Sequence, residues 1–339
     1  MMKYTDINLN NKTILITGGA GFIGANLAFH FQKNYPDSKI VVFDLFRNGE
    51  TFSNGNLKSF GHFKNLLGFQ GEVISGDIND PEAIQKLEDD YTFDYIFHEA
   101  AISDTTVLEQ DLMIKTNVNA FKNLLDLAVK HEANMIYASS AATYGDAPSP
   151  QKLGTEAPNN AYGFSKLMMD NIAKEYMASQ NKISIVGLRY FNVYGPREFF
   201  KNKTASTVIQ FGHQLLAGNT PKLFEGSDNI LRDFIYIEDV IQANVQAMHP
   251  QKSGIFNVGT GKARSFQDIC DILQKELELD LGTDYIPNPY IGRYQFHTEA
   301  DISTTQELLG YQPRFELEEG IKAYIPEIKS IYSNEVSNG

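Results

Sequence analysis

Apolar and polar residues follow two rhythms along the first 190 positions of the chain. Short, continuously apolar runs predict strands, and segments with apolar residues three or four apart predict helices between them. Because the runs do not alternate with polar residues, we expect both faces of the sheet to be covered. The alternation predicts an α/β fold, a Rossmann-type doubly wound parallel sheet. The predicted strands are 13–17, 40–43, 72–75, 95–98, 135–138 and 183–188, and the clearest predicted helices are 22–31, 120–129 and 162–176.

After about residue 190 this rhythm breaks. Segments become shorter, and turn-forming residues gather at 192–197, 225–229 and 287–289. The change predicts a first domain over 1–190 and a smaller C-terminal lobe over 191–330. We expect some segments of the second part to return to the first domain.

Composition and charge narrow the class of protein. The 339 residues are 42% apolar and 21% charged, which is typical of a globular domain, and the formal net charge is −13. This charge argues against nucleic acid or an anionic membrane surface as a partner. No apolar run is long enough to span a bilayer and the N-terminus lacks a signal-peptide pattern, so we expect a cytoplasmic protein. The single cysteine, Cys270, lies in a helical pattern and is interpreted as a core residue.

A glycine-rich turn lies between the first predicted strand and the first predicted helix. Gly18, Gly21 and Gly24 are three apart, which suits a tight turn, close approach of a pyrophosphate and close packing of the helix. Asp44 ends the second strand, where a carboxylate binds the adenosine ribose of NAD. Arg47 follows three residues later and could instead pair with the 2′-phosphate of NADP. The turn predicts a nicotinamide dinucleotide, and the two residues leave NADP and NAD open.

A second constellation carries the candidate chemistry. Ser140 ends the fifth strand, and Tyr162 and Lys166 are four apart, so that on a helix they share one face. A tyrosine is a poor base at neutral pH, and a nearby ammonium together with a positive nicotinamide ring would favour its phenolate form. The serine hydroxyl could bond the same substrate oxygen. The three residues predict proton transfer beside a redox cofactor.

Together these features resemble the extended short-chain dehydrogenase/reductase superfamily. Within it, the chain is similar to the ADP-glyceromanno-heptose 6-epimerase family from about residue 11 to about residue 325. The stretches that carry this narrower resemblance are 98–106, 137–145, 189–198, 222–227, 232–234 and 292–295.

The resemblance implies a reaction and its residues. The family inverts C6 of ADP-D-glycero-D-manno-heptose by transient hydride transfer to tightly bound NADP, in the supply of heptose for the lipopolysaccharide core. One acid/base is Tyr162, oriented by Lys166 and assisted by Ser140, and the second is Lys201. The resemblance also implies a homo-oligomer, with a homopentamer as the expected form, and no metal.

The family's binding positions map onto this sequence, with two departures. Lys203 and Gln210 stand where the best-known members carry a serine and a histidine, and the region between residues 44 and 77 also differs. The implied cofactor contacts are Gly18, Gly21, Phe22, Ile23, Gly24, Asp44, Arg47, Asp77, Ile78, Glu99, Ala100, Ala101, Ile102, Ser103, Asn117, Tyr162, Lys166 and Val193. The implied substrate contacts are Ser103, Asn192, Lys203, Gln210, Phe224, Glu225, Gly226, Ser227, Arg232 and Tyr294.

Three other functions are compared with this one. A 4,6-dehydratase of the superfamily places an acidic pair after the catalytic serine or threonine, where this chain has Ala141 and Ala142. A UDP-sugar 4-epimerase stays open and would not need Lys201. A non-catalytic dinucleotide-binding protein is disfavoured because Ser140, Tyr162 and Lys166 are all present.

Overall fold

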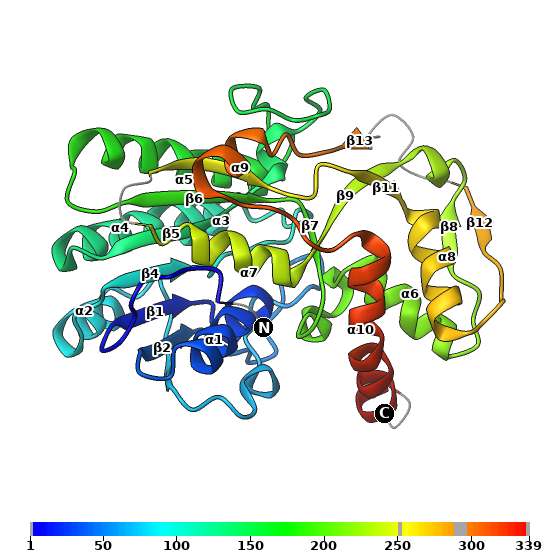
Figure 1. Ribbon diagram of the computed structural model, residues 1–339, viewed down its shortest axis with the longest axis horizontal. Coiled ribbons are helices and arrows are strands. Elements are labelled where there is room, and N and C mark those ends of the chain that lie inside the picture. Colours follow the sequence, from blue (N-terminus) through cyan, green and yellow to red (C-terminus); the bar gives the residue numbers. More distant parts are fainter. Residues whose placement is uncertain (1–2, 250–252, 288–296, 337–339) are drawn as a thin grey trace.

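The computed structural model describes residues 3–249, 253–287 and 297–336. Its centre is a sheet of seven parallel strands in the order β10-β6-β5-β4-β1-β2-β3 (Figure 1). This confirms the predicted Rossmann-type α/β fold. The strands are β1 (Thr13–Thr17), β2 (Lys39–Asp44), β3 (Glu72–Ser75), β4 (Tyr95–His98), β5 (Asn134–Ser140), β6 (Ile185–Tyr190) and β10 (Gly254–Val258).

Helices cover both faces of this sheet, as the apolar runs predict. Successive residues of one strand enter different cores: Ile14 and Ile16 join the core beneath α1 and α7, whereas Leu15 joins the core beneath α2, α4 and α5. The edge strand β3 departs from the prediction, because Val73 is 47% exposed. The flanking helices are α1 (Phe22–Asn34), α2 (Pro81–Asp90), α3 (Gln110–Met113), α4 (Ala120–His131), α5 (Ala161–Ser179) and α7 (Ile237–Gln246).

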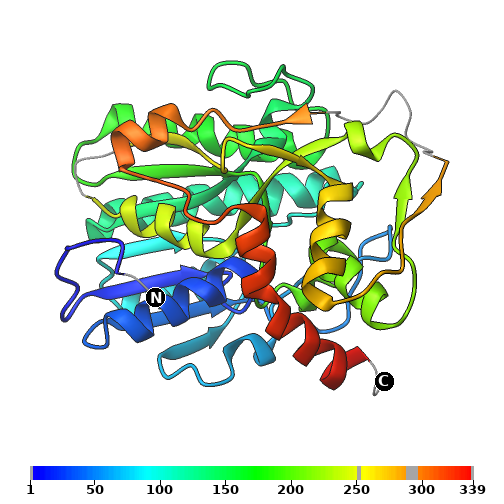
Figure 2. The same ribbon diagram turned by 45° about the vertical axis from the view of Figure 1, so that its right-hand side comes forward.

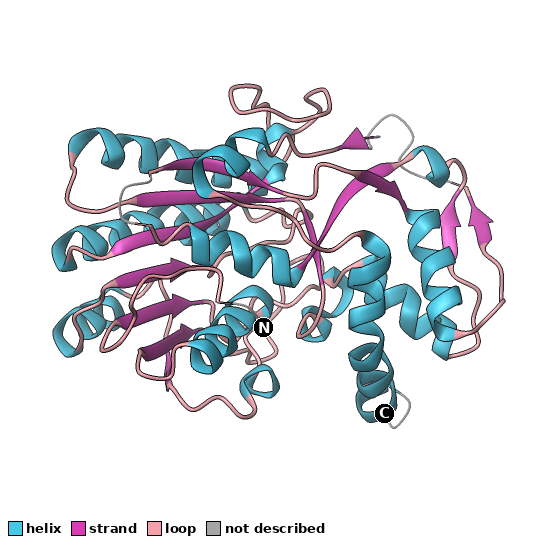
Figure 3. Cartoon of the chain, in the orientation of Figure 1, coloured by secondary structure: helices cyan, strands magenta, loops and turns pink. Residues whose placement is uncertain are grey.

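The second part of the chain builds a smaller lobe beside the carboxyl ends of the central strands (Figures 2 and 3). The helices α6, α8 and α10 pack against one another there, with Cys270 of α8 fully buried in their core. β10 pairs with β6 and therefore belongs to the central sheet. The remaining elements are β7 (Asn192–Tyr194), β8 (Lys222–Phe224), β9 (Leu231–Tyr236), β11 (Ala263–Ser265), β12 (Asp284–Ile286), β13 (His297–Thr298), α6 (Thr207–Leu216), α8 (Phe266–Leu277), α9 (Ser303–Leu309) and α10 (Leu317–Ile331).

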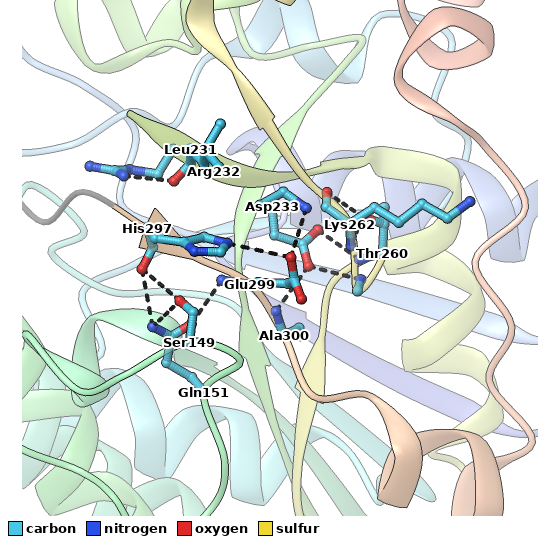
Figure 4. Close-up of polar contacts among 12 residues, drawn as sticks. Ser149, Gln151, Leu231, Arg232, Asp233, Thr260, Lys262, His297, Glu299 and Ala300 are labelled. Carbon is cyan, nitrogen blue, oxygen red and sulfur yellow. Dashed lines mark hydrogen bonds and ion pairs between the residues drawn. The ribbon is translucent and has the colours of Figure 1, made fainter. Parts of the chain in front are cut away.

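A buried aspartate on β9 ties three segments of this lobe together (Figure 4). The Asp233 carboxylate accepts hydrogen bonds from the amides of Thr260, Gly261 and Ala300 at 2.7, 2.9 and 3.0 Å, and from the Thr260 hydroxyl at 2.7 Å. Burial of a carboxylate is costly unless such donors replace water. The network therefore fixes the register of β9 next to Arg232, whose side chain donates to the Leu231 carbonyl at 2.8 Å.

The residues before β1 pack against α1. Leu9 is 1% exposed, the Tyr4 ring stacks on His30 with centroids 5.5 Å apart, and the Tyr35 hydroxyl donates to the Thr5 carbonyl at 3.3 Å. No role for this segment is predicted from the sequence, and in the structure it covers part of the apolar surface of α1. Within the three described ranges, no helix combines the length and the apolar character that a membrane span requires.

A fully buried ion cluster fastens α5 to the central sheet. Arg189 on β6 donates through Nε and Nη2 to one oxygen of Asp170 on α5, at 2.9 and 2.8 Å. The Tyr137 hydroxyl of β5 donates to the other Asp170 oxygen at 2.8 Å, and Arg189 also pairs with Glu156. Asp170 lies one helical turn beyond Lys166, so this cluster fixes the helix that carries the candidate catalytic pair.

We expect Arg189→Met to lower the free energy of unfolding by about 3–5 kcal/mol, because it leaves the buried Asp170 carboxylate without its cation. Urea denaturation followed by circular dichroism measures the change. The control is Lys182→Met, since the Lys182–Glu132 ion pair is exposed and its loss should cost less than about 0.5 kcal/mol. Equal losses of unfolding free energy in the two variants would contradict a stabilising role for the buried Arg189–Asp170 pair.

Candidate active site

A cleft of about 480 Å³ opens at the carboxyl ends of the central strands. Ligands of open α/β sheets bind at this edge. Of the predicted cofactor residues, sixteen line the cleft: Gly18, Gly21, Phe22, Ile23, Gly24, Asp44, Asp77, Ile78, Glu99, Ala100, Ala101, Ile102, Ser103, Tyr162, Lys166 and Val193. Ser140 and Lys201 line it as well, so the four predicted catalytic residues share one cavity.

The glycine turn fits the backbone of a pyrophosphate-binding loop. Gly18 has φ +70°, and a Cβ atom there would lie 2.6 Å from the Ala100 amide nitrogen. A Cβ atom on Gly24 would lie 2.3 Å from the Gly18 carbonyl oxygen. Gly21 caps α1 without a side-chain hydrogen bond, so the first amides of the helix have no side-chain cap. Such a helix start attracts anions through its amides and its dipole.

The Asp44 carboxylate forms the floor at the end of β2. It accepts a hydrogen bond from the Ala20 amide at 2.7 Å, and Asp44 as a whole is 7% exposed. Burial raises the pKa of Asp44 to about 6, although backbone amides of the glycine turn oppose the shift. The predicted ribose-binding carboxylate thus also braces the turn itself.

One wall of the cleft was not predicted from the sequence. It is formed by the segment after β2. Phe52 of this segment is buried, and the side-chain amides of Asn54 and Asn56 donate to the Asp104 carboxylate at 3.0 and 2.7 Å. The segment lacks a helical or strand period, so only its aromatic residues among glycines and asparagines set it apart. Its residues in the cleft lining are Leu45, Phe46, Asn48, Glu50, Phe52, Leu57, Lys58, Ser59, Phe60 and Gly61.

Ser140, Tyr162 and Lys166 meet because α5 begins against the end of β5. Asn160 caps α5 by accepting from the Gly163 amide at 2.8 Å. A Cβ atom on Gly163 would lie 2.3 Å from the Ala142 carbonyl oxygen, so this helix start packs tightly on the loop after Ser140. Glycine is needed there to bring Tyr162 next to Ser140.

Lys166 is tied to the sheet and not to the tyrosine hydroxyl. Its Nζ donates to the Ala138 carbonyl at 2.7 Å and lies 5.9 Å from the Tyr162 ring centroid. Burial lowers the pKa of Lys166 to about 8, against the opposing charges of Glu99 and Asp170. Burial also raises the pKa of Tyr162, while its hydrogen bond with Ser140 lowers it. The chain alone therefore shifts the pKa of Tyr162 opposite to the expected direction, because desolvation and the charge of Glu99 outweigh the hydrogen bond with Ser140.

Glu99 adds an acidic group to the same cavity. Its Oε1 accepts from the Tyr190 hydroxyl at 2.9 Å, and Asn244 donates to that hydroxyl at 2.8 Å. Burial raises the pKa of Glu99 to about 7, partly offset by the Tyr190 hydrogen bond and by Lys166. The cleft thus holds a carboxyl, a phenol and an ammonium that all change their protonation near or above neutral pH.

Lys201 reaches the cleft from a 3-10 segment, Phe199–Thr204, after β7. Its Nζ lies 5.7 Å from the Phe22 ring centroid, and burial lowers its pKa while Glu198 raises it. Glu198 is fully buried and accepts from Gly195 and Ser206. Lys201 and Tyr162 therefore approach the same space from different elements.

Two predicted cofactor residues do not line the cleft. Arg47 donates through Nη2 to the Phe200 carbonyl, a partner that the sequence did not suggest. Asn117 is fully buried and bridges Ile102 to Ser165, with bonds of 2.8 and 2.9 Å to the Ile102 backbone and 2.9 Å to the Ser165 hydroxyl. It supports the loop after β4 and the catalytic helix together.

The predicted substrate residues are more dispersed. Ser103 lines the cleft, Lys203 lines a small adjoining cavity with Lys201, and Gln210 bonds the Lys203 and Ala205 carbonyls. Asn192 precedes Val193 and donates to the Asp233 carbonyl at 3.2 Å. Tyr294 lies outside the described residues. The others lie on the smaller lobe, outside the cleft lining: Phe224, Glu225, Gly226, Ser227 and Arg232.

The protein combines a doubly wound sheet with a tyrosine and a lysine one helical turn apart in its cleft. This combination defines the class of extended short-chain dehydrogenases/reductases. No group of three or more metal-ligating side chains converges within the described ranges. Residues 14–259 match the model of the NAD dependent epimerase/dehydratase family. The chain belongs to this family and is an enzyme of the epimerase class.

Solved structures of nucleotide-sugar epimerases are similar to nearly the whole chain. The chain is 53% identical to the ADP-L-glycero-D-manno-heptose-6-epimerase of Helicobacter pylori, with 97% of this chain and 100% of that chain covered and a TM-score of 0.88. It is 27% identical to a UDP-N-acetylglucosamine 4-epimerase of Methanobrevibacter ruminantium, covering 95% and 99% with a TM-score of 0.82. It is 28% identical to the UDP-glucose 4-epimerase of Thermotoga maritima, covering 94% and 99% with a TM-score of 0.81.

The buried His98 under the glycine turn makes stability depend on pH. Burial, and secondarily Lys166, lowers its pKa to about 3 from the ordinary value of 6.5. Above pH 6.5 the ring is neutral in both states. As the pH falls below 6.5, the unfolded chain binds a proton that the folded protein does not, so stability is lost.

We expect His98→Gln to remove this part of the acid destabilisation. The difference in unfolding free energy between wild type and variant should change by up to about 1.4 kcal/mol per pH unit below pH 6. Urea titrations at pH 7, 5.5 and 4.5 measure it. Parallel pH profiles of the two proteins would show that His98 becomes protonated in the folded state.

Proposed function

We propose that this enzyme is an ADP-L-glycero-D-manno-heptose 6-epimerase, which inverts C6 of ADP-D-glycero-D-manno-heptose and supplies heptose for the lipopolysaccharide core. One observation carries the proposal: Tyr162 and Lys201 face one cavity from different elements, in a chain that matches the Helicobacter pylori enzyme from end to end. Inversion at a secondary alcohol needs the hydroxyl to be served from two directions.

A nicotinamide dinucleotide fits the cleft. The backbone packs too closely around Gly18 and Gly24 for side chains, which keeps the turn tight, and the start of α1 supplies amides without a side-chain cap. Asp77 and Ile78 would flank the adenine, and the segment Glu99–Ser103 the ribose and pyrophosphate. Bound there, an oxidised dinucleotide would supply a hydride acceptor and a positive charge to the site that Tyr162 lines.

Tyr162 holds the proton at one face of C6. Ser140, bonded to the tyrosine, would also bond the C6 oxygen and orient it. Lys166, fixed to the Ala138 carbonyl, keeps a positive charge near the phenol ring. General acid/base groups of this kind contribute on the order of 10²–10⁴-fold in rate.

Lys201 holds the proton at the other face. Burial lowers its pKa, so that a larger fraction of the amine is neutral and able to accept a proton near neutral pH. After a ketone has formed at C6, a turn of the sugar end would place its oxygen at Lys201 in place of Tyr162. The Lys201 ammonium would donate a proton to this oxygen as the hydride returns to C6, and the neutral amine would accept the proton in the reverse direction. Lys203 is the second candidate in this loop.

The ADP-heptose would extend from the cleft to the smaller lobe. We propose contacts from Ser103, Asn192, Lys203, Gln210, Phe224, Glu225, Gly226, Ser227, Arg232 and Tyr294. Arg232 suits a diphosphate because its guanidinium offers paired donors.

We propose NADP as the dinucleotide, as the resemblance implies, with NAD as the alternative. Lys58 lines the same cleft as Asp44 and is the cation that we propose for the 2′-phosphate, since Arg47 donates to the Phe200 carbonyl. Asp44 and Glu50 suit the free hydroxyls of NAD, and Glu50 pairs with Lys58 at 3.3 Å. We also propose a cytoplasmic homo-oligomer, with a pentamer expected.

Dinucleotide released from purified protein should contain the extra phosphate of NADP. In Lys58→Met the share of NAD among released dinucleotide should rise several-fold, because the charge opposite the 2′-phosphate is removed. Mass spectrometry of the released cofactor measures both. Recovery of NAD alone from the wild type would establish the alternative.

A UDP-sugar 4-epimerase is the second candidate, favoured by the two 4-epimerase structures that cover nearly the whole chain. The wild type incubated with ADP-D-glycero-D-manno-heptose should produce its C6 epimer, seen by NMR. Lys201→Met should lose at least about 10²-fold in this rate and keep its cofactor. Turnover of UDP-galactose without inversion of the heptose would overturn the proposal in favour of 4-epimerisation.

A further inference from the structure

Phe200, the residue before Lys201, is held by two residues from the first domain. Its ring stacks on His62 with centroids 3.8 Å apart and planes 5° from parallel. The Arg47 guanidinium carbon lies 5.5 Å from the centroid of the same ring. Arg47 also donates through Nη2 to the Phe200 carbonyl, which belongs to the peptide bond that leads into Lys201. Side chain and backbone of Phe200 are thus both fixed.

Of the two residues that hold Phe200, His62 is anchored to the glycine turn, and Arg47 is anchored to Gly61, the residue before His62. The Arg47 amide donates to the Gly61 carbonyl at 3.0 Å, and the His62 amide donates to the Ala20 carbonyl at 3.1 Å. Asn65 donates to the same Ala20 carbonyl at 3.1 Å. We call residues 45–65 the seat segment. It forms a wall of the cofactor cleft on one side and supports the Lys201 loop on the other.

A second contact fastens the same two segments. Arg197 donates through Nε to the Asn65 carbonyl at 3.2 Å, and its guanidinium carbon lies 4.2 Å from the Phe29 ring centroid. The loop from Arg197 to Lys201 therefore rests on the seat segment at two points.

The loop needs this external support. Asn202, directly after Lys201, has φ 54° and ψ −124°, a conformation that non-glycine residues rarely adopt. Such strain persists only where the surroundings determine the backbone. Within the loop the Lys201 amide donates to the Glu198 carbonyl at 2.9 Å, and the Lys201 carbonyl accepts from the Thr204 hydroxyl at 2.9 Å. Tyr162, in contrast, begins a nineteen-residue helix.

We propose that Arg47 and His62 are positioning residues for Lys201: the wall of the cofactor cleft sets the place of the second acid/base through Phe200. This inference rests on the proposed function of Lys201. It assigns Arg47 to the Lys201 loop and not to the 2′-phosphate. The seat segment also shares an apolar cluster with Tyr162 through Phe52. The contacts of Arg47 and His62 lead instead to Phe200, so losing either of these two side chains should affect only the proton transfer that Lys201 serves.

The test compares the two substrate epimers. ADP-D-glycero-D-manno-heptose and its C6 epimer are each mixed with holoenzyme, and reduction of the bound dinucleotide is followed by stopped-flow absorbance. Tyr162 serves one epimer and Lys201 the other. Arg47→Met should slow oxidation of one epimer on the order of tenfold or more and leave the other within about twofold, with cofactor content unchanged.

Two further variants sharpen the result. Arg47→Gln keeps an amide donor for the Phe200 carbonyl without the charge and should restore part of the lost rate. His62→Leu removes the stacked ring and should slow the same epimer. Lys12→Met is the control. Its ion pair with Asp94 lies at the amino ends of β1 and β4, away from the cleft at their carboxyl ends. Melting temperatures of all variants show that each is folded.

The outcomes separate the inference from the function on which it rests. A wild type that oxidises neither epimer would overturn the proposed function and this inference with it. An active wild type whose Arg47→Met variant loses both rates equally, or loses NADP, would overturn this inference alone. An Arg47→Gln variant that is no faster than Arg47→Met would show that the charge of Arg47 matters and not its hydrogen bond to Phe200. This outcome would also contradict the inference.

Discussion

The position of α5 on the central sheet is the constraint on which the site depends. Arg189 and Asp170, both fully buried, join β6 to the helix one turn beyond Lys166. A pair of charges without water must keep both partners, because a lone buried charge is far more costly than the pair. The cluster therefore allows one placement of the helix, and with it one placement of Tyr162 relative to Ser140 on β5.

From this fixed centre the site extends over parts of very different rigidity. Tyr162 and Lys166 stand on a long helix, and the Lys166 ammonium bonds a carbonyl of the strand beside it. Lys201 stands on a short loop that leans on residues 45–65. The mechanism proposed for this enzyme uses two acid/base groups at one carbon. Tyr162 stands on a helix packed on the central sheet, whereas Lys201 stands where the two parts of the chain meet.

Burial governs the chemistry of the cleft more than the nearest charges do. Glu99 and Asp44 hold their protons more strongly than in water, and Lys166 and Lys201 hold theirs less strongly. Each shift favours the neutral form. Tyr162 follows the same rule, which is why the four-residue spacing to Lys166 did not predict the direction of its pKa.

Local patterns in the sequence determined most of the fold and the centre of the site. Continuous apolar runs give buried strands, glycines three apart give the phosphate turn, and Tyr162 and Lys166 share a helix face, because each feature depends only on neighbours along the chain. The wall at residues 45–65, the partner of Arg47 and the buried place of Asn117 were decided by tertiary structure. They depend on contacts between residues far apart in sequence, such as Arg47 with Phe200, and no local period records which distant carbonyl a side chain will meet.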